Sequence, residues 1–270
     1  MKKNRVVKII LIVLLCCIQL VPLYITVMVS LKPQTDASSY WKFPAVPYLK
    51  NFLVAFEAGN LLRAFGNTFV ITLCATLAVL LLSTMAAYPL ARYPSRFNRG
   101  VRTFFLSIMM IPALSLLVPI YVLLLRVGGI SKYQGIVPVH VAFNLPLAVY
   151  MFSNFIKTIP AELDEAALID GCSIYSIFYR IIVPMLKPVI VSVIILTAVP
   201  VWNDYQYSVY FLQKPQMRVI TLAVASFFQQ SGSDPHVAAA AALMVIVPVV
   251  LLFIFLQKYF IKGMVDGAIK

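Results

Sequence analysis

Residues 159–188 read IPAELDEAALIDGCSIYSIFYRIIVPMLKP, and this stretch decides the fold. It holds four of the nine Asp and Glu residues of the chain. Pro160 suits the first turn of a helix, where its missing N–H is no loss, and the acidic residues that follow favour the positive end of a helix. Gly171 suits the left-handed turn that ends many helices, and Ser173 suits the N-cap of a second helix. The stretch therefore predicts two short helices that meet at a sharp angle.

The second of these helices has apolar residues at helical spacing, namely Ile174, Ile177, Phe178, Ile181 and Ile182. Pro184 and Pro188 then mark the start of the next apolar run. On the first helix, Ala166 and Ala167 make a smooth patch, and Gly171 extends it along one face. Two short helices between long hydrophobic segments indicate a docking element for another protein.

The composition is that of an integral membrane protein. Hydrophobic residues make up 62% of the 270 residues and charged residues 11%, and the mean hydropathy is +0.94. A soluble domain of this length has no way to bury so much apolar surface. The net charge of +13 follows from Lys and Arg residues that hold loops in the cytoplasm, so it does not indicate nucleic-acid binding. The four Cys residues form neither a disulfide framework nor a metal-ligand spacing.

Six apolar runs without Asp, Glu, Lys or Arg predict an all-α membrane protein with six transmembrane helices. The first run is long enough to cross a bilayer, for which about 20 residues suffice, and the fifth, which is shorter, is extended at its inner end by Lys187 and Pro188. The predicted spans are residues 9–31, 64–91, 103–125, 135–156, 189–203 and 237–257. Pro112 and Pro119 are expected to kink the third span. We expect residues 1–63 to form an N-terminal span and an external loop, with a short amphipathic helix near residues 51–58. Residues 64–270 form the predicted transmembrane domain.

The basic residues predict the orientation. Of the 22 Lys and Arg residues, 14 fall on the side of the membrane that holds both termini, and 8 fall on the other side, which has far longer loops. The positive-inside rule assigns the richer side to the cytoplasm. Both termini, and the docking stretch between spans four and five, are therefore expected in the cytoplasm.

The chain lacks the motifs of an enzyme. It has no Gly-x-x-x-x-Gly-Lys-Ser/Thr loop to hold ATP phosphates, no His-Glu-x-x-His and no Gly-x-Ser-x-Gly. No catalytic residue is predicted, and His140, within the fourth span, is expected to be an interface residue rather than a proton relay. A secondary carrier or a membrane-embedded enzyme is the alternative from another class. A carrier should show intramembrane acids and internal repeats, and the sequence has neither.

The docking stretch resembles a signature of the membrane subunits of ABC importers. That signature is Glu-Ala-Ala, three residues, Gly, nine residues and Ile-x-Leu-Pro. It is matched here by Glu165, Ala166, Ala167, Gly171, Ile181, Val183 and Pro184, with Val183 where the family usually has Leu. The features similar to the carbohydrate branch, specifically its shorter maltose-permease-type subunit, are residues 159–160, Leu163, Asp170, Phe178, Trp202, Asn203, Asp204 and residues 257–263.

The resemblance implies a cytoplasmic coupling loop over residues 159–184, whose first helix sits in a cleft of a separate ATPase subunit. The residues that it assigns to ATPase coupling are Glu165, Ala166, Ala167, Asp170, Gly171, Ile181 and Pro184. Glu165 would make a polar or ionic contact there, and the small residues would permit close approach. Asp170 has an alternative role as a local cap of the Gly171 turn.

The resemblance also implies partners and cofactors. A second, homologous permease subunit would share the translocation path, and two ATP-binding cassette subunits would bind ATP and Mg²⁺ inside the cell. An extracytoplasmic sugar-binding protein would deliver the substrate to this complex in the bacterial inner or plasma membrane. The chain itself is expected to bind no cofactor and no metal. The alternative within the same class is an importer for another solute, such as glycerol phosphate or a polyamine.

Polar residues inside the spans indicate where the substrate path runs, because they are costly in lipid and tend to face the interior of the bundle. The candidates are Asn144 on the fourth span and Thr197, Trp202 and Asn203 on the fifth. Two alternatives stay open. Asn144 also suits a helix-to-helix hydrogen bond, and Trp202 suits an aromatic belt at the membrane interface.

Overall fold

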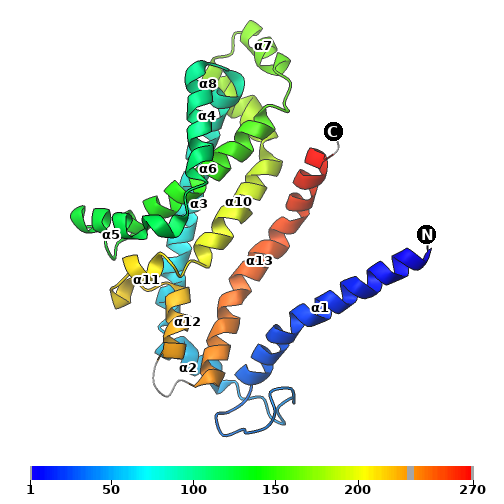
Figure 1. The fold of residues 1–270 in the computed structure, drawn as a ribbon, viewed down its shortest axis with the longest axis vertical. Helices are drawn as coiled ribbons and strands as arrows, with labels where there is room; N and C mark the ends of the chain where they lie inside the picture. Colours follow the sequence, from blue (N-terminus) through cyan, green and yellow to red (C-terminus); the bar gives the residue numbers. More distant parts are fainter. Residues whose placement is uncertain (1, 230–233, 269–270) are drawn as a thin grey trace. The chain divides into compact units, whose positions relative to one another are not determined.

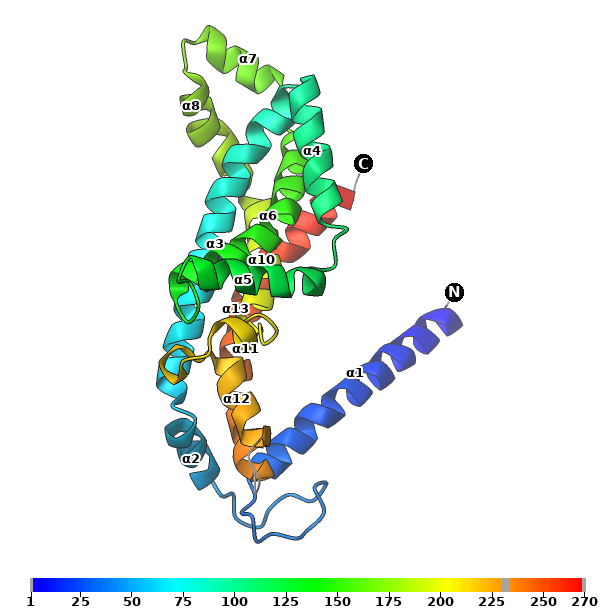
Figure 2. The same ribbon diagram turned by 60° about the vertical axis from the view of Figure 1, so that its left-hand side comes forward.

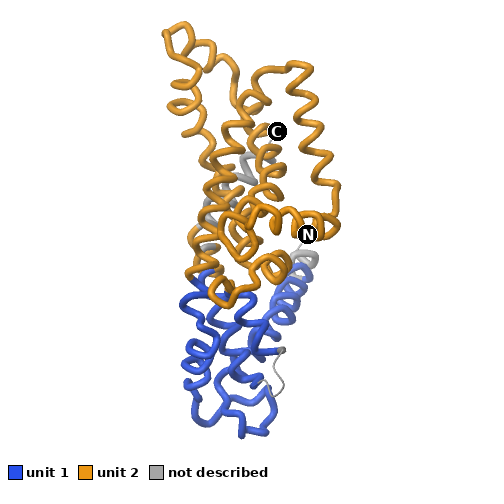
Figure 3. The backbone as a smooth tube through the Cα atoms, turned by 90° about the vertical axis from the view of Figure 1, so that its left-hand side faces the viewer, with its two compact units in different colours: residues 1–65, 220–248 blue, residues 66–219, 249–270 orange. Residues whose placement is uncertain are grey.

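The structure, a computed structural model, describes residues 2–229 and 234–268, and all regular secondary structure in these ranges is helical (Figures 1 and 2). The predicted all-α fold is confirmed for this part of the chain. Lys270, one of the basic residues counted above, lies outside it. The chain divides into two compact units (Figure 3), of which the first holds residues 1–65 and 220–248 and the second residues 66–219 and 249–270. All the candidate site residues lie in the second unit.

The first unit contains few elements. They are α1 (Lys2–Ser30), α2 (Lys50–Ala58), the first residues of α3 (Leu61–Arg92), α12 (Ile220–Gln229) and the first part of α13 (Pro235–Ala268). α2 lies where the sequence predicts a short amphipathic helix.

A buried polar network fastens the loop between α1 and α2. The Nζ atom of Lys32, whose side chain is fully buried, donates hydrogen bonds to Oγ of Ser38 at 2.7 Å and to the carbonyl oxygen of Ser39 at 2.8 Å. The Nδ2 atom of Asn51 donates to the carbonyl oxygens of Ser30 and Lys32, both at 2.8 Å. A buried ammonium is tolerated only when it is hydrogen-bonded, so these contacts define the path of the loop.

The second unit contains the rest of α3 and most of the short helices (Figure 1). In chain order they are α4 (Arg96–Ile108), η1 (Ala113–Leu116), α5 (Leu117–Arg126), α6 (Tyr133–Ile156), α7 (Glu162–Ile169), α8 (Ile174–Ile177), η2 (Phe178–Ile182), α9 (Val183–Met185), α10 (Lys187–Trp202), α11 (Ser208–Phe211) and η3 (Pro215–Met217). Figures 1 and 2 both show α7 at one end of this unit, beyond the ends of α4 and α6.

Four described helices are long and apolar enough to cross a membrane, namely Val7–Ser30 within α1, α3, α6 and Pro235–Phe255 within α13. Two pairs of shorter helices pass the same test together but are sharply bent. One pair is α4 with Ala113–Arg126, bent by 94°, and the other is Ile174–Met185 with α10, bent by 74°. The described residues thus offer four to six spans, and the six predicted from the sequence require each bent pair to count as one.

The third predicted span is broken, whereas its two prolines were expected only to kink it. α4 ends at Ile108, and Pro112 precedes η1 in an extended conformation, with φ −61° and ψ 122°. A proline has no N–H to donate to the preceding turn and forces the residue before it out of the helical region. Pro119 lies in the first turn of α5, where its missing N–H costs nothing. Pro112 therefore separates the two halves, and Pro119 does not bend the second.

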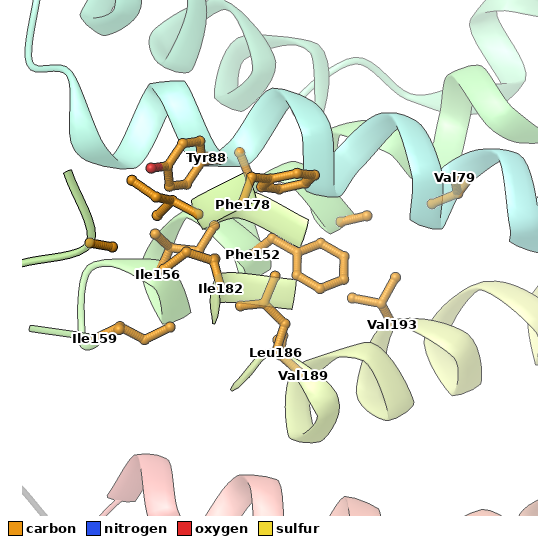
Figure 4. Packing of buried hydrophobic residues seen from close by; sticks show 14 residues of the cluster. Val79, Tyr88, Phe152, Ile156, Ile159, Phe178, Ile182, Leu186, Val189 and Val193 are labelled. Carbon is orange, nitrogen blue, oxygen red and sulfur yellow. The ribbon is translucent and has the colours of Figure 1, made fainter. Parts of the chain in front are cut away.

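The second unit is built around one cluster of buried apolar residues, drawn in Figure 4. Its members come from α3 (Val79, Ala87, Tyr88), from α6 (Ala148, Phe152, Ile156), from α10 (Val189, Val193) and from the segment between α6 and α10 (Ile159, Ala167, Ile177, Phe178, Ile182, Leu186). The ring of Phe178 packs on Tyr88 with centroids 5.4 Å apart. The segment that carries α7 is therefore part of the hydrophobic core of this unit.

The start of α6 touches the backbone of the loop before it. A Cβ atom at Gly135 would overlap the carbonyl oxygen of Gly129 and lie 2.8 Å from its carbonyl carbon. The N–H of Gly129 is itself held by the carbonyl oxygen of Leu124 at 2.7 Å. Because backbone atoms cannot swing aside as a flexible side chain can, position 135 accepts only glycine.

We predict that Gly135→Ala destabilises the protein by about 1–3 kcal/mol, since the added methyl group overpacks a fixed contact. Gly100→Ala is the matched control, because a Cβ atom at Gly100 would meet nothing within 4 Å. Alanine there should stabilise α4 by up to about 1 kcal/mol through helix propensity. Thermal unfolding of the purified variants in detergent measures both effects, and a Gly135→Ala protein as stable as the wild type would refute the contact.

Candidate functional site

α7 ends in a turn that the sequence predicts correctly. Gly171 has φ +80°, in the left-handed region, and a Cβ atom there would meet nothing within 4 Å. The N–H of Gly171 donates to the carbonyl oxygen of Leu168 at 3.0 Å, and the N–H of Cys172 donates to that of Ala167 at 2.9 Å. This pair of bonds is the Schellman motif, which satisfies the last carbonyls of a helix. Glycine is therefore required here by conformation and not by space.

The second short helix also begins as the sequence predicts. Oγ of Ser173 accepts a hydrogen bond from the N–H of Ser176 at 3.3 Å, which caps α8. The helix then widens into the π-helical turn η2, in which the N–H of Val183 donates to the carbonyl oxygen of Phe178 five residues earlier. The predicted apolar face is buried at Ile177, Phe178 and Ile182, partly buried at Ile181 and exposed at Ile174. Pro184, which follows this face, is exposed.

The structure places the residues of α7 on two opposite faces. Asp164 and Ala167 are buried, and Ala167 packs into the core cluster of the second unit. The opposite face, which we call the α7 outer face, is exposed and consists of Glu162, Glu165, Ala166 and Ile169. Ala166 and Ala167, which the sequence analysis assigned to one smooth patch, thus lie on different faces. Only Ala166 of the two is accessible to another protein.

A buried ion pair anchors α7 to the end of α3. The guanidinium of Arg92 holds the carboxylate of Asp164 through Nε at 3.0 Å from Oδ2 and Nη2 at 3.3 Å from Oδ1. The hydroxyl of Tyr88 donates to the same Oδ2 at 3.0 Å. The side chains of Arg92 and Asp164 are only 10% and 12% exposed. A two-point pair of this kind fixes both position and orientation.

Arg92 also holds the chain just before α7. Its Nη1 donates to the carbonyl oxygen of Ile159 at 2.9 Å, and its Nη2 donates to that of Pro160 at 3.4 Å. One guanidinium therefore fastens both the approach to α7 and its first turn. Neither Arg92 nor Asp164 was among the site residues predicted from the sequence. Asp164 and Ala167 are three residues apart and hence on one side of a helix, and this spacing could have indicated that Asp164 belongs to the buried face.

The remaining acids of the segment have a different environment. Glu162, Glu165 and Asp170 are exposed, and within the described residues their carboxylates form no ion pair and no hydrogen bond. The Gly171 turn is capped by backbone groups, so a local capping role for the Asp170 side chain finds no support. Ile169 is 87% exposed beside these acids. Ile169 was not among the predicted site residues either, although its spacing of four residues from Glu165 places the two on one face.

The structure brings two of the four path candidates together. Asn144 of α6 and Thr197 of α10 line a cavity of about 10 Å³ between these helices, which is about the space of one water molecule. Nδ2 of Asn144 donates to the carbonyl oxygen of His140 in its own helix at 2.8 Å. Trp202 and Asn203 do not line this cavity. Asn203 is exposed just after α10, and its Nδ2 donates to the carbonyl oxygen of Val199 at 2.9 Å.

An acid near Asn203 organises the segment that follows α10. The carboxylate of Asp204 accepts hydrogen bonds from the N–H of Tyr207 at 3.1 Å and from the N–H and Oγ of Ser208 at 2.9 and 2.7 Å. Nε2 of His140 lies 3.7 Å from the same carboxylate. The ring of Tyr207 stacks on Phe143, and burial together with the Asp204 charge raises the pKa of its hydroxyl. His140 thus lies in a packed interface within the second unit. Among the described residues no group of three His, Cys, Asp or Glu could hold a metal ion.

Comparison with known proteins identifies the family of this chain. Residues 79–266 match the family described as binding-protein-dependent transport system inner membrane component. The chain belongs to this family. The match begins within α3, includes α7 and the Gly171 turn, and continues into α13, so it covers the whole anchored segment of this permease.

The similarity of this permease to its relatives extends over almost the full chain. The melibiose/raffinose/stachyose import permease protein MelC of Bacillus subtilis (strain 168) is 40% identical, with 95% of this chain and 94% of MelC covered. The arabinooligosaccharides transport system permease protein AraQ of Halalkalibacterium halodurans is 32% identical, with 92% and 90% covered. A solved chain of a bacterial ABC transporter for the import of alginate is 20% identical and superposes with a TM-score of 0.83 over 96% of this chain and 98% of that one, which shows a shared fold.

We predict that Asp164→Ala lowers the free energy of unfolding of this permease by about 3 kcal/mol, because it leaves the Arg92 guanidinium buried without its partner. Asp170→Asn is the matched control, since an exposed acid without contacts should change stability by less than about 0.5 kcal/mol. Thermal unfolding of each purified variant measures its stability, and limited proteolysis within residues 159–173 measures how firmly α7 is held. Equal stability of both would show that the ion pair does not anchor α7.

Proposed function

We propose that this permease is the membrane subunit of a binding-protein-dependent ABC importer that carries oligosaccharides. The observation behind this proposal is the 40% identity with MelC over 95% of the chain, since that relative is named for the import of melibiose, raffinose and stachyose. Other relatives are named for arabinooligosaccharides and maltodextrin. An importer for glycerol phosphate or a polyamine is the weaker candidate, and no observation on this chain favours it.

The complex follows from the family. A second, homologous permease subunit completes the translocation path, and an extracytoplasmic binding protein delivers the sugar. A solved structure with a TM-score of 0.67 to this chain is titled as an alginate ABC transporter in complex with a periplasmic protein that carries an alginate pentasaccharide. Two ATPase subunits bind ATP and Mg²⁺ and perform the hydrolysis. This chain then supplies no catalytic group and no cofactor.

The α7 outer face is the proposed contact with the ATPase. It presents Glu162 and Glu165, whose carboxylates have no partner among the described residues, next to the exposed side chain of Ile169. Partner contacts need accessible groups, and these groups can be used without loss of an internal bond. The opposite face of α7 is fixed to α3 and to the core cluster, so a displacement of α7 by the ATPase is passed to α3, α6 and α10. Ile181, packed against that cluster, would serve this transmission, whereas Glu165, Ala166, Asp170 and the Gly171 turn would serve the contact.

The path itself is proposed to run near the cavity between α6 and α10. Asn144 and Thr197 offer an amide and a hydroxyl there, which suits the hydroxyl groups of a sugar. Trp202 and Asn203, at the end of α10, would act at its entrance. The proposed orientation has both termini and α7 in the cytoplasm, because the positive-inside rule favours that arrangement.

We predict that Glu165→Lys and Ile169→Lys abolish sugar uptake and the ATPase activity stimulated by the binding protein, while the permease still reaches the membrane. Neither change removes a side-chain hydrogen bond between described residues, so a loss of activity indicates loss of the contact with the ATPase. Glu57→Lys is the matched control, because Glu57 is an exposed acid on α2. The complex is reconstituted with its binding protein and tested on melibiose, raffinose, stachyose and maltodextrin.

Two outcomes of that experiment would count against the proposal in different ways. Full coupled activity of both α7 variants would remove the α7 outer face as the ATPase contact. Absence of uptake for every sugar in the panel by the wild-type complex, with normal binding of ATPase subunits, would leave the contact standing and would exclude this substrate class.

We predict that a reporter active only in the cytoplasm works when it is fused after Arg99 and is silent when it is fused at Ser38. The physical reason is the excess of basic residues in the loops and termini that the six-span topology assigns to the same side of the membrane as Arg99. Whole-cell activity of each fusion, normalised to its expression level, measures the orientation. Activity at Ser38 would reverse the proposed topology.

A further inference from the structure

A cavity of the first unit lies against the loop between α1 and α2, whose course Figures 1 and 2 show. Its volume is about 420 Å³. Pockets for small ligands usually have about 300–1,000 Å³. The side chains around it combine aromatic rings, hydroxyl groups and a carboxylate, and they include Ile25, Asp36, Ser38, Ser39, Tyr40 and Trp41. We call it the Trp41 cavity. All of the candidate site residues lie in the second unit, so this cavity is not part of the site described above.

The loop that forms the wall of the Trp41 cavity is held from its buried side. The ammonium of Lys32 is fully buried and donates to Oγ of Ser38 and to the carbonyl oxygen of Ser39. The N–H of Tyr48 donates to the carbonyl oxygen of Leu31 at 2.8 Å, which joins the two ends of the loop. Burial of an ammonium group costs free energy, so this conformation is maintained against a cost. Loops held on a rigid support in this way are where proteins commonly carry their binding residues.

Trp41 has a fixed backbone and an accessible ring. The hydroxyl of Tyr24 on α1 donates to the carbonyl oxygen of Trp41 at 2.8 Å, and the centroids of the two rings are 6.3 Å apart. The N–H of Trp41 donates to Oγ of Ser39 at 3.4 Å. Trp41 is nevertheless 59% exposed, and Tyr40 beside it is 50% exposed. Such rings offer a ligand a broad apolar face at a low cost in conformational entropy.

Asp36 adds a charged acceptor to these rings. Its Oδ1 accepts a hydrogen bond from the N–H of Ser38 at 2.8 Å. Hydrogen bonds from the side chain and the backbone of Ser38, and more weakly the charge of Lys32, lower the pKa of the Asp36 carboxyl, so it is ionised at neutral pH. A carboxylate has about four acceptor positions, of which Ser38 takes at most two.

The charges around the Trp41 cavity favour a neutral ligand. Among the described residues that line it none is basic, so an anion such as a phosphate group would meet only the negative charge of Asp36. That charge is in turn offset by the ammonium of Lys32, which lies behind Ser38 and binds the same serine. A neutral molecule with both apolar faces and hydroxyl groups therefore suits this cavity better than an anion or a cation.

We propose that the Trp41 cavity is an external subsite for a neutral oligosaccharide. A sugar ring has an apolar face, which fits the rings of Trp41 and Tyr40, and hydroxyl groups at its rim, which fit the carboxylate of Asp36 and the hydroxyl of Ser39. The inference rests on the proposed function for the class of ligand, and on the proposed orientation for access to the cavity from outside the cell.

The test uses the fluorescence of Trp41 in the full-length permease, purified in mild detergent. The chain has two Trp residues, so in the Trp202→Phe protein the Trp emission comes from Trp41 alone. We expect raffinose and stachyose to change this emission in a saturable way, because a sugar ring stacked on the indole excludes water from it. The difference between the wild type and Trp41→Phe isolates the same signal without the Trp202 substitution.

Asp36→Asn should weaken the apparent affinity for the sugar about tenfold, the effect of losing a hydrogen bond to a charged group. Asparagine keeps an oxygen for the N–H of Ser38, so the loop is preserved. Glu57→Gln is the matched control, because Glu57 is an exposed acid of the same unit that does not line the cavity. Its affinity should equal that of the wild type. Unchanged affinity in Asp36→Asn, or an equal loss in Glu57→Gln, would overturn the subsite.

Further outcomes separate the sugar from other occupants and from the proposed function. A response of Trp41 to spermidine but not to sugars would assign the cavity to a cation. Quenching of Trp41 by brominated lipids in nanodiscs, without a response to sugars, would assign the ring to the membrane interface, and both results would overturn the subsite. Uptake by the reconstituted complex of a sugar to which Trp41 does not respond would overturn the subsite and leave the proposed function intact. A saturable response of Trp41 to sugars, with no uptake by the complex, would support the subsite and contradict the proposed function.

Discussion

The bidentate ion pair between Arg92 and Asp164 is the interaction on which the arrangement of the second unit depends. α7 has eight residues, which is too short for a helix to be stable by itself in water. At one end it is fastened by the guanidinium of Arg92, and at the other end by the Schellman turn at Gly171. Between these points Ala167 contacts the core. Since the pair joins α7 to the last residue of α3, any force on the short helix is delivered to the end of a long one.

The acids of α7 illustrate how neighbouring carboxylates acquire different roles. Asp164 is enclosed and receives three donors, whereas Glu165, the next residue, is exposed and receives none from a described residue. A helix turns by about 100° per residue, so adjacent positions face different surroundings. One carboxylate therefore serves the internal structure, and its neighbour remains available to a partner. Interpretations based on composition alone cannot separate the two.

The sequence was sufficient for those features that local physical chemistry determines. The left-handed turn at Gly171 and the cap at Ser173 follow from preferences of single residues, and each was predicted. The start of α7 was predicted wrongly, because Pro160, expected in the first turn, lies before the N-cap Ala161, and the helix begins at Glu162. The pairing of Arg92 with Asp164 joins positions 72 residues apart, and nothing in the local pattern selects Arg92 among the basic residues of its turn. The burial of Ala167 likewise depends on tertiary packing. Contacts between residues far apart in the chain therefore do not follow from local sequence preferences.

The π-helical turn η2 determines which changes in length the segment after Gly171 tolerates. Its wide turn accommodates one residue more than an α-helical turn. Deletion of one residue between Phe178 and Ile182 would close this turn to α-helical geometry and would leave the residues that follow in register. Insertion of one residue would instead rotate everything that follows by about 100°. Leu186, Val189 and Val193 would then leave the core cluster together. Natural variation in η2 should therefore include substitutions and the loss of one residue, but no gain of a residue.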